Sequence, residues 1–426
     1  MRQIVIVIVL LCACAAAAND AAAQFIGGGI ALHYNPSIRA AGMGGGSAAA
    51  FWGHDPNYWA NPALLGYHRG IRFEHGRTRL IPDFFDDVYF TSDRLTVGYW
   101  GVGFSMAGRP FDGLGEIELD YGEIPIVKEG PGGSGIQIGT HNPYEKIRSW
   151  SLGVSLSELV GRLVEVAGCD GPAFERYGDV ALGFSRRIYE YDLAPAVSDP
   201  DLGELEAVKG DAESNDRGML VRFTPYNSVD YPGHFPRLDS FLDRWVGGFR
   251  LDVSAGTSSK NYNDPTIMYY EGRSPIPIAR VARQGWGLHA AVGFPGAAEE
   301  YLDEHGLGLV AESLTPLLSF GQAWDRLLPS VPDPDSRDRF QDTEIEQSGW
   351  ELTICNVFSI RRGRMDEPSG DIHGDTSGWS LGFRFADIGG FRYDRATIPQ
   401  STVLGNVERK GYTFFVDPVE LWRLLR

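Results

Sequence analysis

The sequence has no long apolar run beyond its first residues. After Leu11 no uninterrupted stretch approaches the roughly 20 apolar residues that a membrane-spanning helix needs. Because only helices and closed barrels satisfy every backbone polar group in lipid, a membrane protein with this sequence would have to be a β-barrel. The 54 glycines and the aromatic content of 12% suit strands with one face on lipid and one on water. A soluble secreted β-protein would have the same composition, so the strand patterns must separate the two.

Cysteine and positive charge are also scarce. Of four cysteines, Cys12 and Cys14 lie near the start, and Cys169 and Cys355 are far apart without a second Cys or His at metal-ligand spacing. A disulfide between the last two is permitted but not established, and both are interpreted as packing residues. The 38 basic residues are outnumbered by 56 acidic ones, which gives a net charge of −18 and makes a nucleic-acid partner unlikely.

Catalytic signatures are missing as well. The chain has no Gly-x-Ser-x-Gly elbow, no Gly-x-x-x-x-Gly-Lys phosphate loop and no His-Glu-x-x-His helix. Two sets of acidic residues match no calcium-loop pattern and are interpreted as solvated loops: Asp333, Asp335 and Asp338, and Asp371 and Asp375. Four early histidines have irregular spacing and are interpreted as backbone-bonded residues rather than ligands: His33, His54, His68 and His75. The sequence therefore predicts a protein that is not an enzyme and needs neither cofactor nor metal.

The first residues predict an export signal. A short charged start is followed by the apolar run Ile4 to Leu11 and an alanine-rich tract that ends at Ala23. This arrangement is typical of a secretory signal peptide over residues 1–23, with cleavage before Gln24.

Several later segments alternate apolar with small or polar residues, which is the period of a strand with two different faces. In one of them Phe249, Leu251 and Val253 alternate with polar residues. Similar alternation occurs over residues 150–157, 180–185, 286–294 and 379–385. The polar faces carry Gly, Ser, Arg and Asp, which suits a wet or plugged lumen better than a dry core.

Tryptophans recur near the starts of candidate strands. The five positions are Trp150, Trp245, Trp286, Trp350 and Trp379. In a barrel such a repeat places indoles at one level of the wall, where amphipathic rings prefer the membrane boundary. In a soluble sandwich the same residues would be scattered through the core. We predict the membrane-interface row.

The segment from Ser37 to Tyr67 combines a glycine-dense turn, an alanine run, aromatics and an Asn-Pro step. Glycines permit positive φ and close backbone approach, and the residue before a proline is pushed out of the helical region. Trp52, Tyr58 and Trp59 argue against a simple glycine-rich linker. The segment is predicted to be a buried, irregular insert that needs a cavity around it.

The order of residues in this segment resembles the N-terminal plug of the outer-membrane long-chain fatty-acid transporter family, and more closely its PorV/PorQ relatives of type IX secretion. The residues that carry the resemblance are Arg39, Gly42, Met43, Gly44, Gly45, Asp55, Asn61 and Pro62. The likeness continues through residues 79–87, 104–117 and 177–187, and weakens after about Pro195. It implies an all-β fold: a closed antiparallel transmembrane barrel of about 14 strands with the plug in its lumen. The eight residues are then plug or binding residues.

These inferences divide the chain into parts. Residues 1–23 are the signal peptide, 24–67 the plug, 68–418 the barrel with long loops, and 419–426 a C-terminal tail. A helical or irregular insertion is expected over about 295–348, with Trp324, Leu327 and Leu328 as a docking face, and polar loops over Pro195 to Arg217 and Asn261 to Arg280.

The expected location is the bacterial outer membrane, with outer-membrane lipid as one partner. Two roles follow from the resemblance: transport of hydrophobic small molecules, or protein secretion together with secretion-system proteins. A soluble secreted or periplasmic β-rich binding or structural protein is the alternative from another class.

Overall fold

The computed structural model describes residues 29–425, except for 54, 109–116, 130–134, 167–176, 200–202, 206, 229–247, 269–274, 296–313, 333–338, 342, 369–370, 386–387 and 401–404. Several sequence-based predictions lie outside the described residues: the signal peptide, His54, Cys169, Trp245 and the acidic residues Asp333, Asp335 and Asp338.

Within the described residues the main sheet is a closed antiparallel barrel with fourteen strand positions. Its strands are β1 (Gly70–Arg79), β2 (Tyr89–Tyr99), β3 (Val102–Ala107) with β4 (Ile117–Asp120), β7 (Tyr144–Ser155), β8 (Gly178–Ala194), β11 (Val208–Asn227), β12 (Gly248–Lys260), β15 (Arg280–Pro295), β16 (Leu314–Pro332), β18 (Ile345–Ile354), β19 (Phe358–Glu367), β20 (Ile372–Phe385), β21 (Gly389–Ile398) and β22 (Val407–Val416). Each pairs with its neighbours along the chain, and β1 pairs with both β2 and β22, which closes the sheet. The predicted fold class is confirmed.

Shorter elements complete the described chain. They are the helices α2 (Ile30–His33), α3 (Ile38–Gly42), η1 (Pro62–Tyr67), α4 (Leu156–Val166) and α7 (Pro418–Leu425), the hairpins β5 (Ile124–Glu129) with β6 (Gly135–His141), β9 (Val197–Asp199) with β10 (Gly203–Leu205) and β13 (Thr266–Ile267) with β14 (Ile276–Pro277), and β17 (Arg339–Gln341) beside β16. None of the described helices is both long enough and apolar enough to traverse a bilayer.

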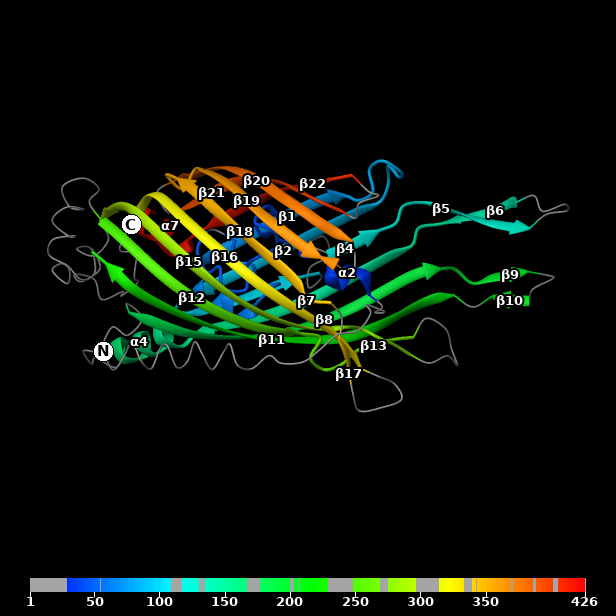
Figure 1. Ribbon diagram of the computed structural model, residues 1–426, viewed down its shortest axis with the longest axis horizontal. Helices are drawn as coiled ribbons and strands as arrows, with labels where there is room; N and C mark the ends of the chain where they lie inside the picture. Colours follow the sequence, from blue (N-terminus) through cyan, green and yellow to red (C-terminus); the bar gives the residue numbers. More distant parts are fainter. Residues whose placement is uncertain are drawn as a thin grey trace.

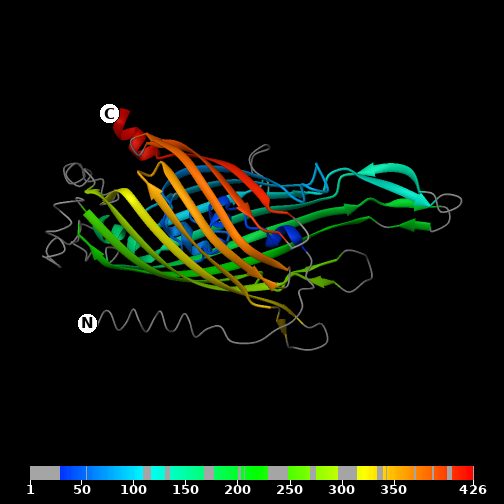
Figure 2. The same ribbon diagram turned by 45° about the horizontal axis from the view of Figure 1, so that its top comes forward.

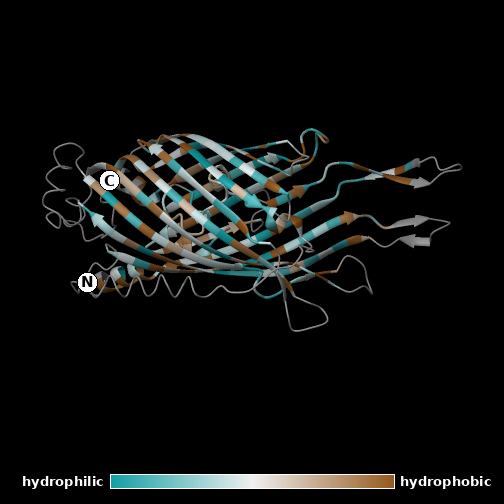
Figure 3. Cartoon of the chain, viewed as in Figure 1, coloured by the Kyte–Doolittle hydropathy of each residue, from teal (hydrophilic) through white to brown (hydrophobic). Residues whose placement is uncertain are grey.

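The strands form because their side chains alternate between two environments. In β12 the buried Asp252 and Ser254 point into the barrel, while Leu251 and Val253 remain partly exposed on the outer wall. Figure 3 shows the resulting alternation of hydrophilic and hydrophobic bands along the strands. Large apolar residues stay exposed on many strands, for example Leu182, Phe383 and Phe414. A closed sheet with an apolar outer wall is the architecture of bacterial outer-membrane barrels, and this chain is located in that membrane.

The tryptophans stand on this wall. Trp150, Trp286 and Trp379 are 40%, 52% and 36% exposed, and Trp350 is half-buried. The Trp286 ring stacks on Trp324 of β16 with centroids 3.9 Å apart. That these rings lie at the membrane interface stays a prediction.

The two ends of the barrel differ (Figures 1 and 2). The end that carries α7, here the α7 end, has the tight turns at Trp100–Gly101 and at 355–357. From the opposite end, here the hairpin end, β5–β6 and β9–β10 project beyond the barrel. Short turns are typical of the periplasmic side of such barrels and long loops of the outer side.

The expected insertion over 295–348 was wrong in its described part. Residues 314–332 form the long strand β16 instead of a helix, and β18 begins at Ile345. The apolar spacing of Trp324, Leu327 and Leu328 also fits alternation: the side chain of Leu327 is buried, and Trp324 lies on the outer wall. Periodicity alone does not distinguish a helix from a strand in a short apolar run. Here the pairing of β16 with β15 and β18 makes these residues a strand.

Three smaller expectations also need correction. The polar stretch Pro195 to Arg217 is a loop only in part, because β11 already begins at Val208 and pairs with β8. The strand expected over 150–157 ends at Ser155, where α4 follows. Cys355 is not a packing residue but an exposed turn residue with φ of 51°.

Candidate functional site

The N-terminal segment fills the lumen of the barrel. Almost every described residue from Ser37 to Gly66 is buried. Along this segment α3 contacts β20 and β21, and η1 contacts β7, β8 and β11. We call residues 29–67 the plug.

Local sequence explains the shape of the plug. The Ser37 hydroxyl accepts a hydrogen bond from the Ala40 N–H at 3.1 Å and so caps the start of α3. Gly44 and Gly45 then have φ of 70° and 88°, a conformation that side chains rarely permit. At the other end, the Asn61 side chain accepts from the Ala63 N–H at 3.1 Å and caps η1, with Pro62 at the first helical position.

Glycines of the barrel wall let the plug lie directly on the sheet backbone. Five of them are in register on five adjacent positions of the sheet: Gly98, Gly103, Gly153, Gly183 and Gly218. A Cβ at Gly103 would lie 2.0 Å from the Leu65 carbonyl oxygen, and one at Gly183 would lie 2.2 Å from the Ala63 nitrogen. This glycine row therefore forms a groove in the wall for η1.

On the opposite wall, glycines likewise let the glycine turn of the plug lie directly on the sheet backbone. A Cβ at Gly349 would lie 2.3 Å from the Met43 carbonyl oxygen, and a Cβ at Gly363 would lie 2.3 Å from the Gly44 nitrogen. Conversely, a Cβ on Gly44 would lie 2.5 Å from the carbonyl oxygens of Ser348 in β18 and Arg364 in β19. Plug and wall thus meet backbone to backbone on both sides of the barrel.

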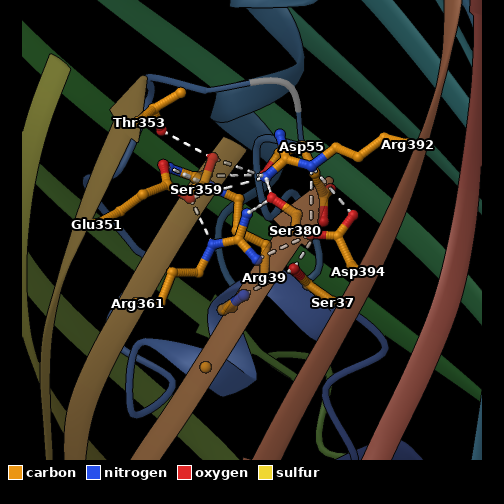
Figure 4. A network of polar contacts seen from close by, with 12 residues as sticks. Ser37, Arg39, Asp55, Glu351, Thr353, Ser359, Arg361, Ser380, Arg392 and Asp394 are labelled. Atoms are coloured by element: carbon orange, nitrogen blue, oxygen red, sulfur yellow. Dashed lines mark hydrogen bonds and ion pairs between the residues drawn. The ribbon is translucent and has the colours of Figure 1, made fainter. Parts of the chain in front are cut away.

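Buried ion pairs fix α3 to the wall (Figure 4). The Arg39 guanidinium donates to both Glu351 carboxylate oxygens, with Nη2 at 2.8 Å from Oε1. Glu351 also accepts from Arg361 Nε at 2.5 Å, and Arg361 Nη1 donates to Asp394 at 2.8 Å. All four residues are buried. Because an unpaired buried charge is costly, each member of this chain stabilises the others.

Asp55, which follows the glycine turn in the plug, lies close to the start of α3 and to Arg94 of β2. Its carboxylate accepts from the Ser37 hydroxyl at 2.8 Å and lies 3.8 Å from Arg94 Nη2. Burial alone would raise the pKa of Asp55, but the positive charges of Arg94 and Arg72 outweigh it, and the pKa is lower than usual. The plug therefore carries a fixed negative charge here. A cavity of about 20 Å³ beside it, room for about one water molecule, is lined by polar groups that include Arg39, Asp55 and Arg94.

A third anchor holds the middle of the plug. The Asp325 carboxylate accepts from the backbone N–H groups of Ser47 and Ala48, at 2.8 and 2.9 Å, and from Arg283 at 3.0 Å. The Asn61 amide donates to the Ala48 carbonyl at 2.8 Å and to the Met219 carbonyl at 3.0 Å. Asn61 thus links the turn to both the plug and β11.

Toward the hairpin end the interior changes from charged to apolar. Inward-facing residues of the wall pack there against α2 and Trp59, and they include Phe90, Ile117, Leu119, Ile147, Tyr189 and Tyr191. We call this cluster, with Ala31 and Leu32 of α2, the apolar compartment.

Glu145 holds the helix α2 against the apolar compartment. Glu145 accepts from the Ala31 N–H at 2.7 Å and from the Tyr121 hydroxyl at 2.6 Å. Burial, with Lys260 and Arg187 nearby, lowers the pKa of His33 to about 4, so its imidazole is neutral at neutral pH. Ile30 of the same helix is 53% exposed.

Beside the apolar compartment the described strand pairing is interrupted where β3 gives way to β4, with one residue of β7 between its pairings with the two strands. β2 pairs with β3 through Leu95 and with β4 through Ser92, so two residues of β2 separate the ladders. Ten residues separate their partners Met106 and Ile117 in the sequence. The adjoining strand ends, Ala107 and Ile117, belong to the apolar compartment.

These features define a class of protein: an outer-membrane β-barrel whose lumen is closed by its own N-terminal segment and contains an apolar compartment. No family model and no curated protein matches the sequence. Among solved structures, the Ralstonia pickettii toluene transporter TbuX is similar with 10% identity, a TM-score of 0.40 and coverage of 90% of this chain and 98% of that one.

Two further structures of the same kind are similar over most of their length. A TodX monoaromatic hydrocarbon channel mutant has 9% identity, a TM-score of 0.41 and coverage of 90% and 99%. A Pseudomonas aeruginosa FadL homologue has 10% identity, a TM-score of 0.31 and coverage of 92% and 98%.

The structure places the eight residues named from the resemblance within one plug, but at different anchors. Arg39 and Asp55 lie at the charged network, Gly42 to Gly45 lie against β18 to β20, and Asn61 and Pro62 lie against β8 and β11. Sequence reasoning missed the wall partners Glu351, Arg361, Asp394 and Asp325. The signal for them was a charged residue in the inward-facing phase of a strand. Within the described chain no set of three potential metal ligands comes together.

Proposed function

We propose that this protein is a plugged outer-membrane conduit that binds hydrophobic molecules in its lumen and passes them across the membrane. The observation that supports it most is the apolar compartment, which is the largest apolar cluster among the described buried residues. The inner wall of a water-filled pore is polar, whereas ligand sites for hydrophobic molecules are lined by apolar and aromatic side chains.

The interrupted wall position supports a route through the side of the barrel. Ala107 and Ile117 flank the interruption and belong to the compartment. A molecule that left the compartment here would move from an apolar interior to the lipid-facing surface without crossing the charged network around Arg39. Entry would require α2 to shift, since Ala31 and Leu32 fill part of the compartment.

Binding of 1-N-phenylnaphthylamine to the purified protein in detergent tests the proposal. Leu32→Asn in α2 and Ile147→Asn in β7 place an amide in the compartment and should weaken binding at least tenfold. Leu152→Asn is the matched control, because Leu152 lies on the same strand but is 41% exposed on the outer wall. Equal affinity in all three variants would refute binding in the compartment.

We also propose a second function, based on the resemblance of the plug sequence to PorV/PorQ proteins: a role in type IX secretion. The β5–β6 hairpin projects beyond the barrel and exposes Ile124, Val127 and Ile138 by 46%, 55% and 51%. Exposed apolar side chains on a projecting hairpin suit contact with another protein.

Deletion of residues 124–141 tests that role separately. In cells that have the secretion machinery, export of its cargo should fall while probe binding by the purified barrel is retained. Unchanged export would refute the secretion role, whatever the binding assay gives.

A further inference from the structure

The outer wall changes from apolar to basic at one level on several strands. Going toward the hairpin end, Phe414 and Tyr412 of β22 are followed on the same face by Lys410. On β21, Phe391 and Tyr393 are followed by Arg395, and on β1, Phe73 and His75 by Arg77. The inward residues between them are buried, which places the three cations on the outer wall.

These three cations are direct neighbours. Arg77 is in register with Lys410, and Lys410 with Arg395. Such residues on adjacent strands have Cα atoms about 5 Å apart and side chains on one face. We call Arg77, Lys410 and Arg395 the basic row.

The basic row carries more positive than negative charge. Glu408 contacts both Arg395, at 2.5 Å, and Lys410, at 3.0 Å. Arg77 lies over the Tyr89 ring at 3.8 Å. Among the described residues, Glu408 is the one carboxylate within ion-pair distance of these three cations. Like charges directly opposite one another destabilise a sheet, so the row favours an additional anion.

Two other basic residues of the outer wall differ from the row. Arg148 pairs with Glu190 at 2.9 Å and Arg186 with Glu213 at 2.5 Å, so each has a carboxylate of its own. The excess of positive charge at the row is notable in a chain with a net charge of −18.

We propose that the basic row binds the phosphate groups of an anionic lipid in the membrane leaflet at the hairpin end. Its position supports a lipid rather than a free anion. The row adjoins Tyr393 and Tyr412, whose ring centroids are 5.3 Å apart, and Phe391 stacks on Tyr412 one step farther from the row, so aromatic rings cover the wall beside the three cations. A phosphorylated lipid can therefore place its chains on these rings and its phosphate between the guanidinium and ammonium groups.

Native mass spectrometry of the intact barrel in detergent tests this site, with diphosphoryl lipid A as the probe and its monophosphoryl form for comparison. We expect the diphosphoryl lipid to bind more tightly. In the triple variant R77Q/K410Q/R395Q its affinity should fall by about fivefold for each charge removed. R148Q/R186Q is the matched control and should bind as the parent does.

The proposal is overturned if the triple variant retains parental affinity, or if both lipids bind equally well, which would mean that only the acyl chains are recognised. Migration of unboiled samples on a gel confirms that each variant is folded. Should the triple variant not fold, the single variant Lys410→Gln is measured in its place, with a fivefold loss expected and no loss overturning the proposal.

Discussion

Arg39 of the plug and Glu351 of β18 form a buried ion pair across 312 positions of sequence, with Nη2 2.8 Å from Oε1. Both side chains are 3% exposed. The pair ties a five-residue helix to the far wall of the barrel. Glu351 also accepts a hydrogen bond from Arg361 of the wall. Without Arg39 of the plug, this network of wall residues would lack one of its positive charges.

Replacing Arg39 by Gln should loosen the plug. Loss of one partner of a buried pair leaves an uncompensated charge and costs about 3–5 kcal/mol. We expect higher single-channel conductance in planar bilayers and a lower unfolding temperature. Arg69→Gln removes a 40% exposed cation paired with Glu158 and is the control. Parental conductance in Arg39→Gln would show that the pair does not hold the plug.

Gly183→Ala should displace η1. The new Cβ would lie 2.2 Å from the plug backbone, and such overpacking costs about 1–3 kcal/mol. Unfolding in denaturant should show this loss, with increased permeability to small polar solutes. At Gly139 a Cβ would meet only Ile126 Cδ1 at 3.6 Å, so Gly139→Ala is the matched control. Equal stability of both variants would contradict direct contact between η1 and the wall.

The sequence predicted the barrel because alternation is a local property. In β12 the buried Asp252 and Ser254 and the outward Leu251 and Val253 follow the predicted phase. The prediction failed for residues 314–332, since the spacing of Trp324 and Leu327 fits two periods and only pairing with β15 decides between them.

The site was predictable only on the plug side. Glycine and proline positions define turns locally, so Gly44 and Asn61 could be singled out from sequence. Their partners Gly363 and Met219 are on distant strands, and their role follows from barrel register. The apolar compartment was also missed, because Ile147 and Tyr189 have the same alternation as residues that face polar neighbours.

Stability of the α2 region should fall on mild acidification. Burial lowers the pKa of His33 in the folded protein to about 4, against the usual 6.5 of histidine, so the unfolded chain binds the proton more readily. The contribution of the neutral His33 to the stability of the folded protein is complete above pH 6.5 and is lost as the pH falls toward 4. The protection factors of the amides of residues 30–34, which are exchange rates corrected for the intrinsic effect of pH, should therefore fall between pH 7 and pH 5, and His33→Gln should remove this dependence.

Ile30→Gln changes an exposed residue of the same helix and is the control for that measurement. It should retain the loss of protection at low pH. A parental pH dependence in His33→Gln would assign the effect to another group.

The orientation of the barrel can be tested with its exposed cysteine. Cys355 lies in the turn between β18 and β19 at the α7 end. We assign this end to the periplasm because its turns at 100–101 and 355–357 are short and the hairpins β5–β6 and β9–β10 project from the opposite end. In the variant Cys169→Ser, a membrane-impermeant maleimide should leave Cys355 unlabelled in intact cells and label it after the outer membrane is opened. In a chain that carries Cys169→Ser, Cys355→Ser and Val127→Cys, the thiol is on the β5–β6 hairpin and should be labelled in intact cells. The reverse pattern would place the hairpins in the periplasm, and the basic row would then face the inner leaflet.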